Sequence, residues 1–159
     1  MNTDSPALLC PELLRRTALR WTLLGSRCCD CGELYFPARA SCTRCCGSTL
    51  QEHDLGAEGL LWSWTIQTFL PKPPCDMGGT AQAFRPYGVG YVELGCGLKV
   101  ESRLIGTEFD ALYIGAPMVL TLDPYRLGVD GAPLHTYAFQ LLDAAPPARG
   151  QVHEVSDGR

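Results

Sequence analysis

Four cysteines of this chain have the spacing of a tetrahedral metal site. Cys28 and Cys31 form one Cys-x2-Cys pair, and Cys42 and Cys45 form a second pair after ten intervening residues. Two residues between paired cysteines let a tight turn direct both sulfur atoms at one point, where backbone N–H groups can hydrogen-bond the thiolates. A closed shell of four thiolates leaves no open position for water, so the spacing predicts a structural metal and not a hydrolytic one.

Zinc is the metal that we predict here, at one ion per chain. Similar knuckles hold iron as Fe(Cys)4, which would make the chain a coloured electron carrier, and four reduced core cysteines are the alternative without a metal. The register of the ligands is open as well, because Cys29 and Cys46 each adjoin a predicted ligand and could replace it. Gly32 follows the first pair, where a knuckle commonly needs a positive φ, but Cys46 stands in that position after the second pair.

The distribution of charge excludes some partners. The 159 residues carry a net charge of −4, and residues 51–159 contain seven basic against thirteen acidic side chains. An acidic body lacks the basic face that binds a phosphate backbone, so nucleic acid is not the expected ligand. An odd number of cysteines, nine, and the lack of a signal-peptide pattern predict a cytoplasmic protein. No apolar run approaches the roughly 20 residues of a membrane span.

The segment before the cysteine array has the periodicity of an amphipathic helix over residues 10–25. Three arginines lie on the polar face, and Leu19 and Leu23 fall outside the apolar stripe. A small metal ribbon offers little apolar surface, so we expect this helix to dock on a partner protein, and the alternative is a helix that packs on its own domain. The side chains predicted to make that contact are Leu14, Trp21 and Leu24.

The rest of the chain predicts a mainly β protein with a small barrel. Strand-like segments cover residues 50–55, 59–69, 87–94, 98–105, 118–125 and 134–142, separated by Gly, Pro and Asp. Five main strands, the first of them long, suggest a partly open barrel of the OB type with a helical turn between residues 108 and 115. A β-sandwich is the alternative. Trp62 and Trp64 should share one face of the first long strand if its alternation holds.

This pattern divides the chain into four parts. Residues 1–25 form the N-terminal segment with the docking helix, residues 26–49 the metal ribbon, residues 50–143 the barrel and residues 144–159 a flexible tail. Residues 70–86 contain four prolines and two adjacent glycines, which predicts a long connection with little regular structure. Cys75 lies in this connection, but the three histidines offer it no local motif for a base, so no catalytic residue is predicted.

The cysteine array and the strands after it resemble a known family. The run RCCDCGELYFPARASCTRCCGS, followed by GAEGLLWSWT, RPYGVGYVEL and IGAPMVLTL, is similar to the zinc-ribbon plus OB-fold family labelled domain of unknown function 35, over about residues 10–142. The resemblance implies a rubredoxin-like zinc ribbon and a C-terminal five-stranded OB-fold barrel. It also implies that Cys28, Cys31, Cys42 and Cys45 are the metal ligands and that Pro86 and Tyr87 begin the second barrel strand.

The resemblance also implies a role. Members of this family are small acyl-CoA-associated subunits of thiolase-like enzymes, including aldolases and thiolases of steroid, aromatic or fatty acyl degradation. The expected assembly has two copies of each chain, with catalytic groups in the other subunit and the acyl-CoA near the interface. Arg85 could meet a CoA phosphate, because a guanidinium binds phosphate in a fork geometry. The alternatives are a stand-alone OB-fold module that binds acyl-CoA or nucleic acid, and the Fe(Cys)4 electron carrier.

Overall fold

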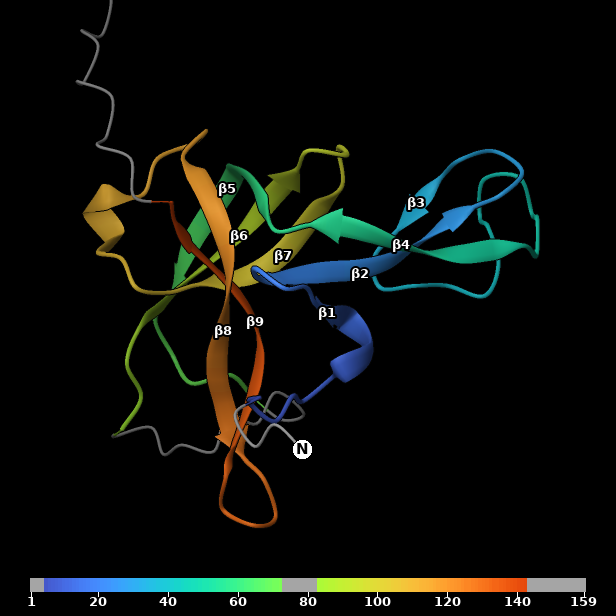
Figure 1. Ribbon diagram of the computed structural model, residues 1–159. Helices are drawn as coiled ribbons and strands as arrows, with labels where there is room; N and C mark the ends of the chain where they lie inside the picture. Colours follow the sequence, from blue (N-terminus) through green and yellow to red (C-terminus); the bar gives the residue numbers. More distant parts are fainter. Residues whose placement is uncertain (1–4, 73–82, 143–159) are drawn as a thin grey trace, which may run out of the picture.

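The computed structural model describes residues 5–72 and 83–142, and Figure 1 shows two β units joined side by side. The predicted tail, Cys75 and most of the predicted loop lie outside these residues. Within the described part of the chain, no helix is both long enough and apolar enough to cross a membrane. The only helical segments there are two short 3-10 turns, η1 (Pro11–Leu13) and η2 (Phe109–Ala111). The second of them confirms the helical turn predicted between residues 108 and 115.

The first unit is a small antiparallel sheet built around β2 (Trp21–Cys28). Its first half pairs with β1 (Leu14–Arg16), and its second half pairs with β3 (Leu34–Tyr35), while β4 (Leu50–Gly56) runs along its other edge. The far end of this sheet carries the cysteine array. In Figure 1 the sheet extends away from the rest of the molecule.

The second unit is a closed five-stranded barrel. Its strands are β5 (Glu58–Gln67), β6 (Tyr87–Leu94), β7 (Lys99–Leu104), β8 (Pro117–Leu127) and β9 (Pro133–Leu141), in the order β5-β6-β7-β9-β8. Local alternation of apolar and polar residues located these strands to within about two residues, which is the precision that such patterns allow. The five-stranded barrel is confirmed, and the sandwich alternative is wrong.

The predicted N-terminal helix is wrong, because residues 14–28 form a β-hairpin. Thr17 closes its turn: the Thr17 hydroxyl donates to the Arg20 carbonyl at 2.7 Å and accepts from the Arg20 N–H at 3.0 Å. Leu14 then pairs with Leu23, and these two side chains are 6% and 0% exposed, whereas Leu19 at the turn is 94% exposed. A helix would have left Leu23 outside the apolar stripe, whereas strand pairing buries it completely.

The two tryptophans of β5 also differ from the expectation. A register shift between Leu61 and Ser63 marks a β-bulge, which reverses the alternation of side chains along the strand. Trp62 therefore points outward and is 51% exposed, whereas Trp64 packs against the core. The expectation that both share one face is wrong, because it assumed an unbroken strand.

One hydrophobic core runs through both units. Leu14, Leu23 and Leu55 of the first sheet belong to the same buried cluster as the barrel residues Leu61 and Phe139. A second link is an edge-on ring contact, 5.5 Å between centroids, between Phe36 after β3 and Tyr137 of β9. The ribbon is therefore held against the barrel by packing, and not by the chain connection at Ala57 alone.

Candidate metal centre and barrel surface

The four predicted ligands meet at the tip of the ribbon. The sulfur atoms of Cys28, Cys31, Cys42 and Cys45 all lie within 4.8 Å of one another. Cys28 Sγ is 3.6 Å from Cys45 Sγ, and Cys31 Sγ is 3.5 Å from Cys42 Sγ. A tetrahedral ion with Zn–S bonds of about 2.3 Å places its sulfur ligands about 3.8 Å apart. The donor set and its spacing therefore fit a zinc ion.

The structure favours the predicted ligand register over the alternatives. Cys29 and Cys46 are exposed, and neither belongs to the cluster found among the described residues. Cys46 is the one non-glycine residue in the described chain with a positive φ, at 60°, and Gly32 holds the matching place in the first knuckle at 77°. The second knuckle therefore keeps the left-handed turn that thiolate ligation needs, although a cysteine with its Cβ pays a steric cost there.

Tyr35 supports the cluster from the strand between the two knuckles. Its hydroxyl accepts from the Thr43 N–H at 3.0 Å and lies 3.1 Å from Cys42 Sγ and 3.2 Å from Thr43 Oγ1, so its proton can donate to the sulfur while the Thr43 hydroxyl donates to it. This hydrogen bond lowers the pKa of the Cys42 thiol to about 6. This role of Tyr35 was not predicted from the sequence, because nothing in the local pattern shows which way its hydroxyl points.

The pKa of the Cys45 thiol is raised, in contrast to that of Cys42, because other sulfur atoms lie close to it. The backbone N–H of Gly47 lowers the pKa of Cys45, but the neighbouring sulfurs of Cys31, Cys42 and Cys28 outweigh it and raise the pKa to about 12. Four thiolates at this distance repel one another unless a cation lies between them. Beside the cluster, an ion pair of 2.9 Å between Arg44 and Glu33 ties the two knuckles together.

We predict that Tyr35→Phe weakens metal binding by about 10- to 100-fold, the usual effect of losing a hydrogen bond to a ligand. The ring and its packing remain, so the secondary structure should not change. Competition with a chromophoric chelator measures the affinity, and circular dichroism checks the fold. An affinity equal to that of the wild type would show that the hydroxyl does not support the ligand.

The outer face of the barrel carries a partly buried ion pair. Arg103 Nη1 of β7 donates to Asp123 Oδ2 of β8 at 2.5 Å, and the guanidinium lies 4.5 Å from the centre of the Tyr87 ring. Burial raises the pKa of Asp123, although Arg103 and then His135 act to lower it. Arg103 thereby joins two strands and an aromatic ring.

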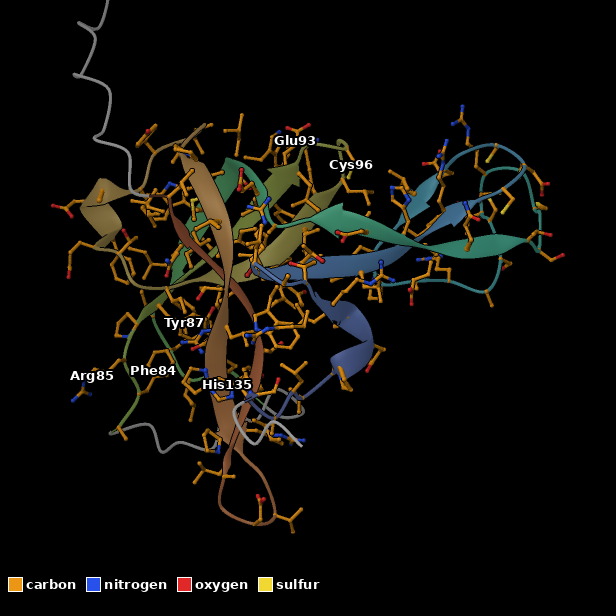
Figure 2. All side chains as sticks on the ribbon, viewed as in Figure 1. Phe84, Arg85, Tyr87, Glu93, Cys96 and His135 are labelled. Atoms are coloured by element: carbon orange, nitrogen blue, oxygen red, sulfur yellow. The ribbon has the colours of Figure 1, made fainter. Side chains whose placement is uncertain are left out.

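The remaining predicted site residues lie apart from the metal. Arg85 precedes β6 and is exposed, with its Nη1 donating to the Phe84 carbonyl at 3.1 Å, and Figure 2 shows it at the end of the barrel that also carries His135. Trp21 and Leu24 are half-buried in the ribbon sheet, and Leu14 is only 6% exposed. In this conformation Leu14 contributes to the chain's own core, so little of its surface is left for a partner.

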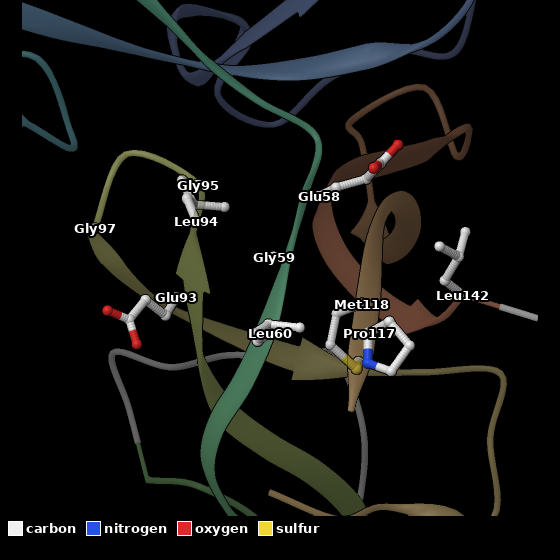
Figure 3. A pocket seen from close by; sticks show the side chains of 10 residues that line it. All are labelled: Glu58, Gly59, Leu60, Glu93, Leu94, Gly95, Gly97, Pro117, Met118 and Leu142. Atoms are coloured by element: carbon white, nitrogen blue, oxygen red, sulfur yellow. The ribbon is translucent and has the colours of Figure 1, made fainter. Parts of the chain in front are cut away.

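An apolar groove opens at the other end of the barrel, between the β6–β7 turn and the start of β8 (Figure 3). Its volume is about 470 Å³. The apolar side chains that line it are Leu60, Leu94, Pro117, Met118 and Leu142, and Glu58 and Glu93 lie at its edge. Glu93 is paired with Lys99 at 3.5 Å, and Glu58 with Arg20. The groove offers apolar contact surface but no thiol or imidazole.

Two family descriptions match successive parts of the chain. Residues 21–51 match the rubredoxin-like zinc ribbon domain of ChsH2, and residues 52–123 match the C-terminal OB-fold domain of ChsH2. The first match begins at the first residue of β2, and the second begins within β4 and runs into β8. The family's zinc ribbon and this chain's four-cysteine cluster both indicate a metal site at the tip of the ribbon.

Known proteins align with most of the chain. Benzoylsuccinyl-CoA thiolase subunit BbsA of Thauera aromatica is 30% identical over 120 residues, which cover 76% of this chain and 76% of BbsA. A DUF35 domain-containing scaffold protein of Methanocaldococcus jannaschii is 27% identical over 126 residues, which cover 78% of this chain and 84% of that protein. The solved structure of the Ltp2-ChsH2(DUF35) aldolase shares the fold, with a TM-score of 0.58, 24% identity and coverage of 76% and 84%.

Proposed function

Because the chain belongs to the ChsH2 family of zinc-ribbon and OB-fold proteins, also called DUF35, we propose that it is the non-catalytic subunit of a thiolase-like enzyme. Its partner would cleave a carbon–carbon bond in an acyl-CoA, by thiolysis or by a retro-aldol reaction. The observation that carries this proposal is the match to a thiolase subunit, BbsA, across 76% of both chains. The scaffold proteins among the relatives support the same role.

The metal centre supports a structural role for this chain. Four cysteine sulfurs would complete the coordination of one zinc ion, which leaves no position for a substrate or for water. The metal would hold the two knuckles together, and the core shared by ribbon and barrel would transmit that order to the barrel. In residues 5–72 and 83–142, no hydrogen bond joins a cysteine thiol to a histidine ring. We therefore place the catalytic groups in the partner.

We further propose how the chain meets its partner and the substrate. Trp21 and Leu24 on the ribbon sheet would contact the catalytic subunit, with Leu14 supporting them from below. Arg85 would bind a phosphate of CoA at the end of the barrel, where its guanidinium is exposed. The segment 70–86, which leads to Arg85, would narrow the route of the acyl-CoA into the partner. Two copies of each chain would make up the enzyme.

Co-purification with activity assays tests the proposal. The affinity-tagged full chain, expressed in its own host, should retain a larger thiolase-like protein that mass spectrometry identifies. The purified pair should then cleave an acyl-CoA thioester substrate, whereas this chain alone should not. A chain that is monomeric in its host and cleaves the thioester by itself would overturn the proposal.

The same assay tests the role of Arg85. In the assembled enzyme, Arg85→Ala should raise the KM for the acyl-CoA by about 10- to 100-fold, since a lost charged hydrogen bond costs about 1.5–3 kcal/mol. Arg85→Lys is the matched control, because it keeps the charge without the fork and should give an intermediate KM. If Arg85→Ala left the KM unchanged, a contact between Arg85 and the substrate would be ruled out.

A further inference from the structure

The hairpin of β8 and β9 extends beyond the barrel as an arm, which we define as residues 123–136 (Figure 1). β8 pairs with the barrel strand β5 through residues 117–119, and β9 meets β7 at Phe139. Beyond these contacts, the two strands of the arm pair with each other from Asp123 to Leu127. An isolated hairpin of this kind is only marginally stable in water, so an ordered arm needs a brace.

Contacts with the N-terminal segment and with the barrel strand β7 brace the arm. The N-terminal segment runs beside it: the Leu9 N–H donates to the His135 carbonyl at 2.8 Å, and the His135 N–H donates to the Ala7 carbonyl at 2.8 Å. At its root, Asp123 forms the 2.5 Å ion pair with Arg103 of the barrel strand β7. These contacts hold the base of the arm at Asp123 and at His135, whose strand partner is Pro124, while Leu127 and Val129 stay exposed.

The tip is an ordered turn that holds apolar side chains in the solvent. The Gly128 N–H donates to the Ala132 carbonyl at 2.7 Å, and the Ala132 N–H donates to Asp130 Oδ1 at 3.1 Å. Gly131 closes the turn with a φ of 77°. Leu127 is 68% exposed and Val129 is 111% exposed, so Val129 touches almost nothing in its own chain. A preordered tip with apolar ends loses little conformational entropy on binding, which is a property of interface anchors.

The charge of the tip indicates the charge of the partner surface that would bind it. Arg126 is exposed and forms no ion pair within the described residues, whereas the carboxylate of Asp130 is used inside the turn. The tip region therefore carries a cation, Arg126, and two exposed apolar side chains, Leu127 and Val129. Its complement is an apolar pocket with a carboxylate at the rim.

We infer that the tip of this arm, through Leu127, Val129 and Arg126, inserts into such a pocket on the thiolase-like catalytic subunit. The inference rests on the proposed function and adds a second contact to it, at the barrel end opposite the apolar groove. The alternative binding partner of the arm is a second copy of this chain. The apolar groove of that copy, with Glu58 and Glu93 at its edge, could receive the tip. The groove lies at the start of β8 and the arm at its end, so such copies would join head to tail, and a head-to-tail contact closes only in a ring.

The test uses the thiolase-like protein that the tagged wild-type chain retains, purified and titrated with variants of the full chain. The double variant Leu127→Ser with Val129→Ser should bind it about 10- to 100-fold more weakly, as for the loss of apolar interface anchors. Arg126→Glu should weaken binding by about tenfold, and added salt should reduce the difference from the wild type. Ile114→Ser is the matched control, because Ile114 is 64% exposed outside the arm and should leave binding unchanged.

Each result decides for or against the inference. Because these side chains are exposed, all variants should keep the thermal stability and metal content of the wild type. Wild-type affinity in the double variant would overturn the inference while leaving the proposed function standing. If the wild-type chain alone formed oligomers and the double variant did not, the arm would bind a second copy of this chain and not the catalytic subunit. If the wild type retained no thiolase-like protein, the proposed function itself would fail. The inference that the arm binds such a protein would fail with it.

Discussion

Replacing Cys28 with serine is expected to remove the metal and to unfold the ribbon. Cys28 is 1% exposed and its sulfur lies within the four-thiolate cluster, so no neighbouring group or water can take its place without rearrangement. Structural zinc contributes an apparent binding free energy of about 10–16 kcal/mol in small ribbons, which is more than a ribbon of this size gains from packing. Elemental analysis of the desalted protein should find about one zinc per wild-type chain and little or none in the variant.

Cys29→Ser and Cys46→Ser are the matched controls for this experiment. Both cysteines are neighbours of ligands in the sequence, but both are exposed and lie outside the cluster. These variants should therefore keep a full equivalent of metal and the wild-type circular dichroism. Loss of metal in either of them would mean that the ligand register differs from the one described here. Iron in place of zinc, with the red colour of an Fe(Cys)4 site, would favour the electron carrier instead.

Leu23→Ala is expected to destabilise the whole chain by about 2–5 kcal/mol, the range for removing a fully buried leucine side chain. Leu23 is 0% exposed and lies in the ribbon sheet, but it packs in the same cluster as the barrel core. The cavity would therefore weaken the ribbon and the barrel together. Chemical denaturation followed by tryptophan fluorescence and far-UV circular dichroism measures the change, and the two signals should shift by the same amount.

Leu19→Ala provides the control, because Leu19 is four residues away in the same hairpin and 94% exposed. Its effect on the free energy of unfolding should stay within about 0.5 kcal/mol. If Leu23→Ala and Leu19→Ala changed the free energy of unfolding equally, the result would contradict the hairpin and support the helix predicted for this segment. Separate transitions in the Leu23 variant would show that ribbon and barrel do not share a core.

The two expected results bear on the proposed function together. If the ribbon and the barrel form one packed body, then loss of the metal at one end should also loosen the surface that the barrel offers to a partner. The zinc would then be required for assembly, although it takes no part in the reaction. Chelation of the metal from the assembled enzyme would be expected to release the catalytic subunit without changing its catalytic residues.

The features that depend on local spacing could be predicted from the sequence. The paired cysteines identified the metal cluster, since two knuckles need only short turns to bring their sulfurs together. Alternation of apolar and polar residues located the five barrel strands, because a strand's two faces repeat every second residue. The same local patterns supported the resemblance to the family, which the comparisons then established.

Only the tertiary structure decided the features that depend on distant partners. Residues 10–25 have a helical pattern, but β4, some thirty residues later, supplies the backbone hydrogen bonds that make β2 a strand. A bulge in β5 separates Trp62 from Trp64, and the fold brings the Tyr35 hydroxyl to Cys42 and Arg103 to Asp123. The energy of strand pairing between segments far apart in the chain outweighs local propensity. The periodicity of a short sequence window contains no information about such distant pairing.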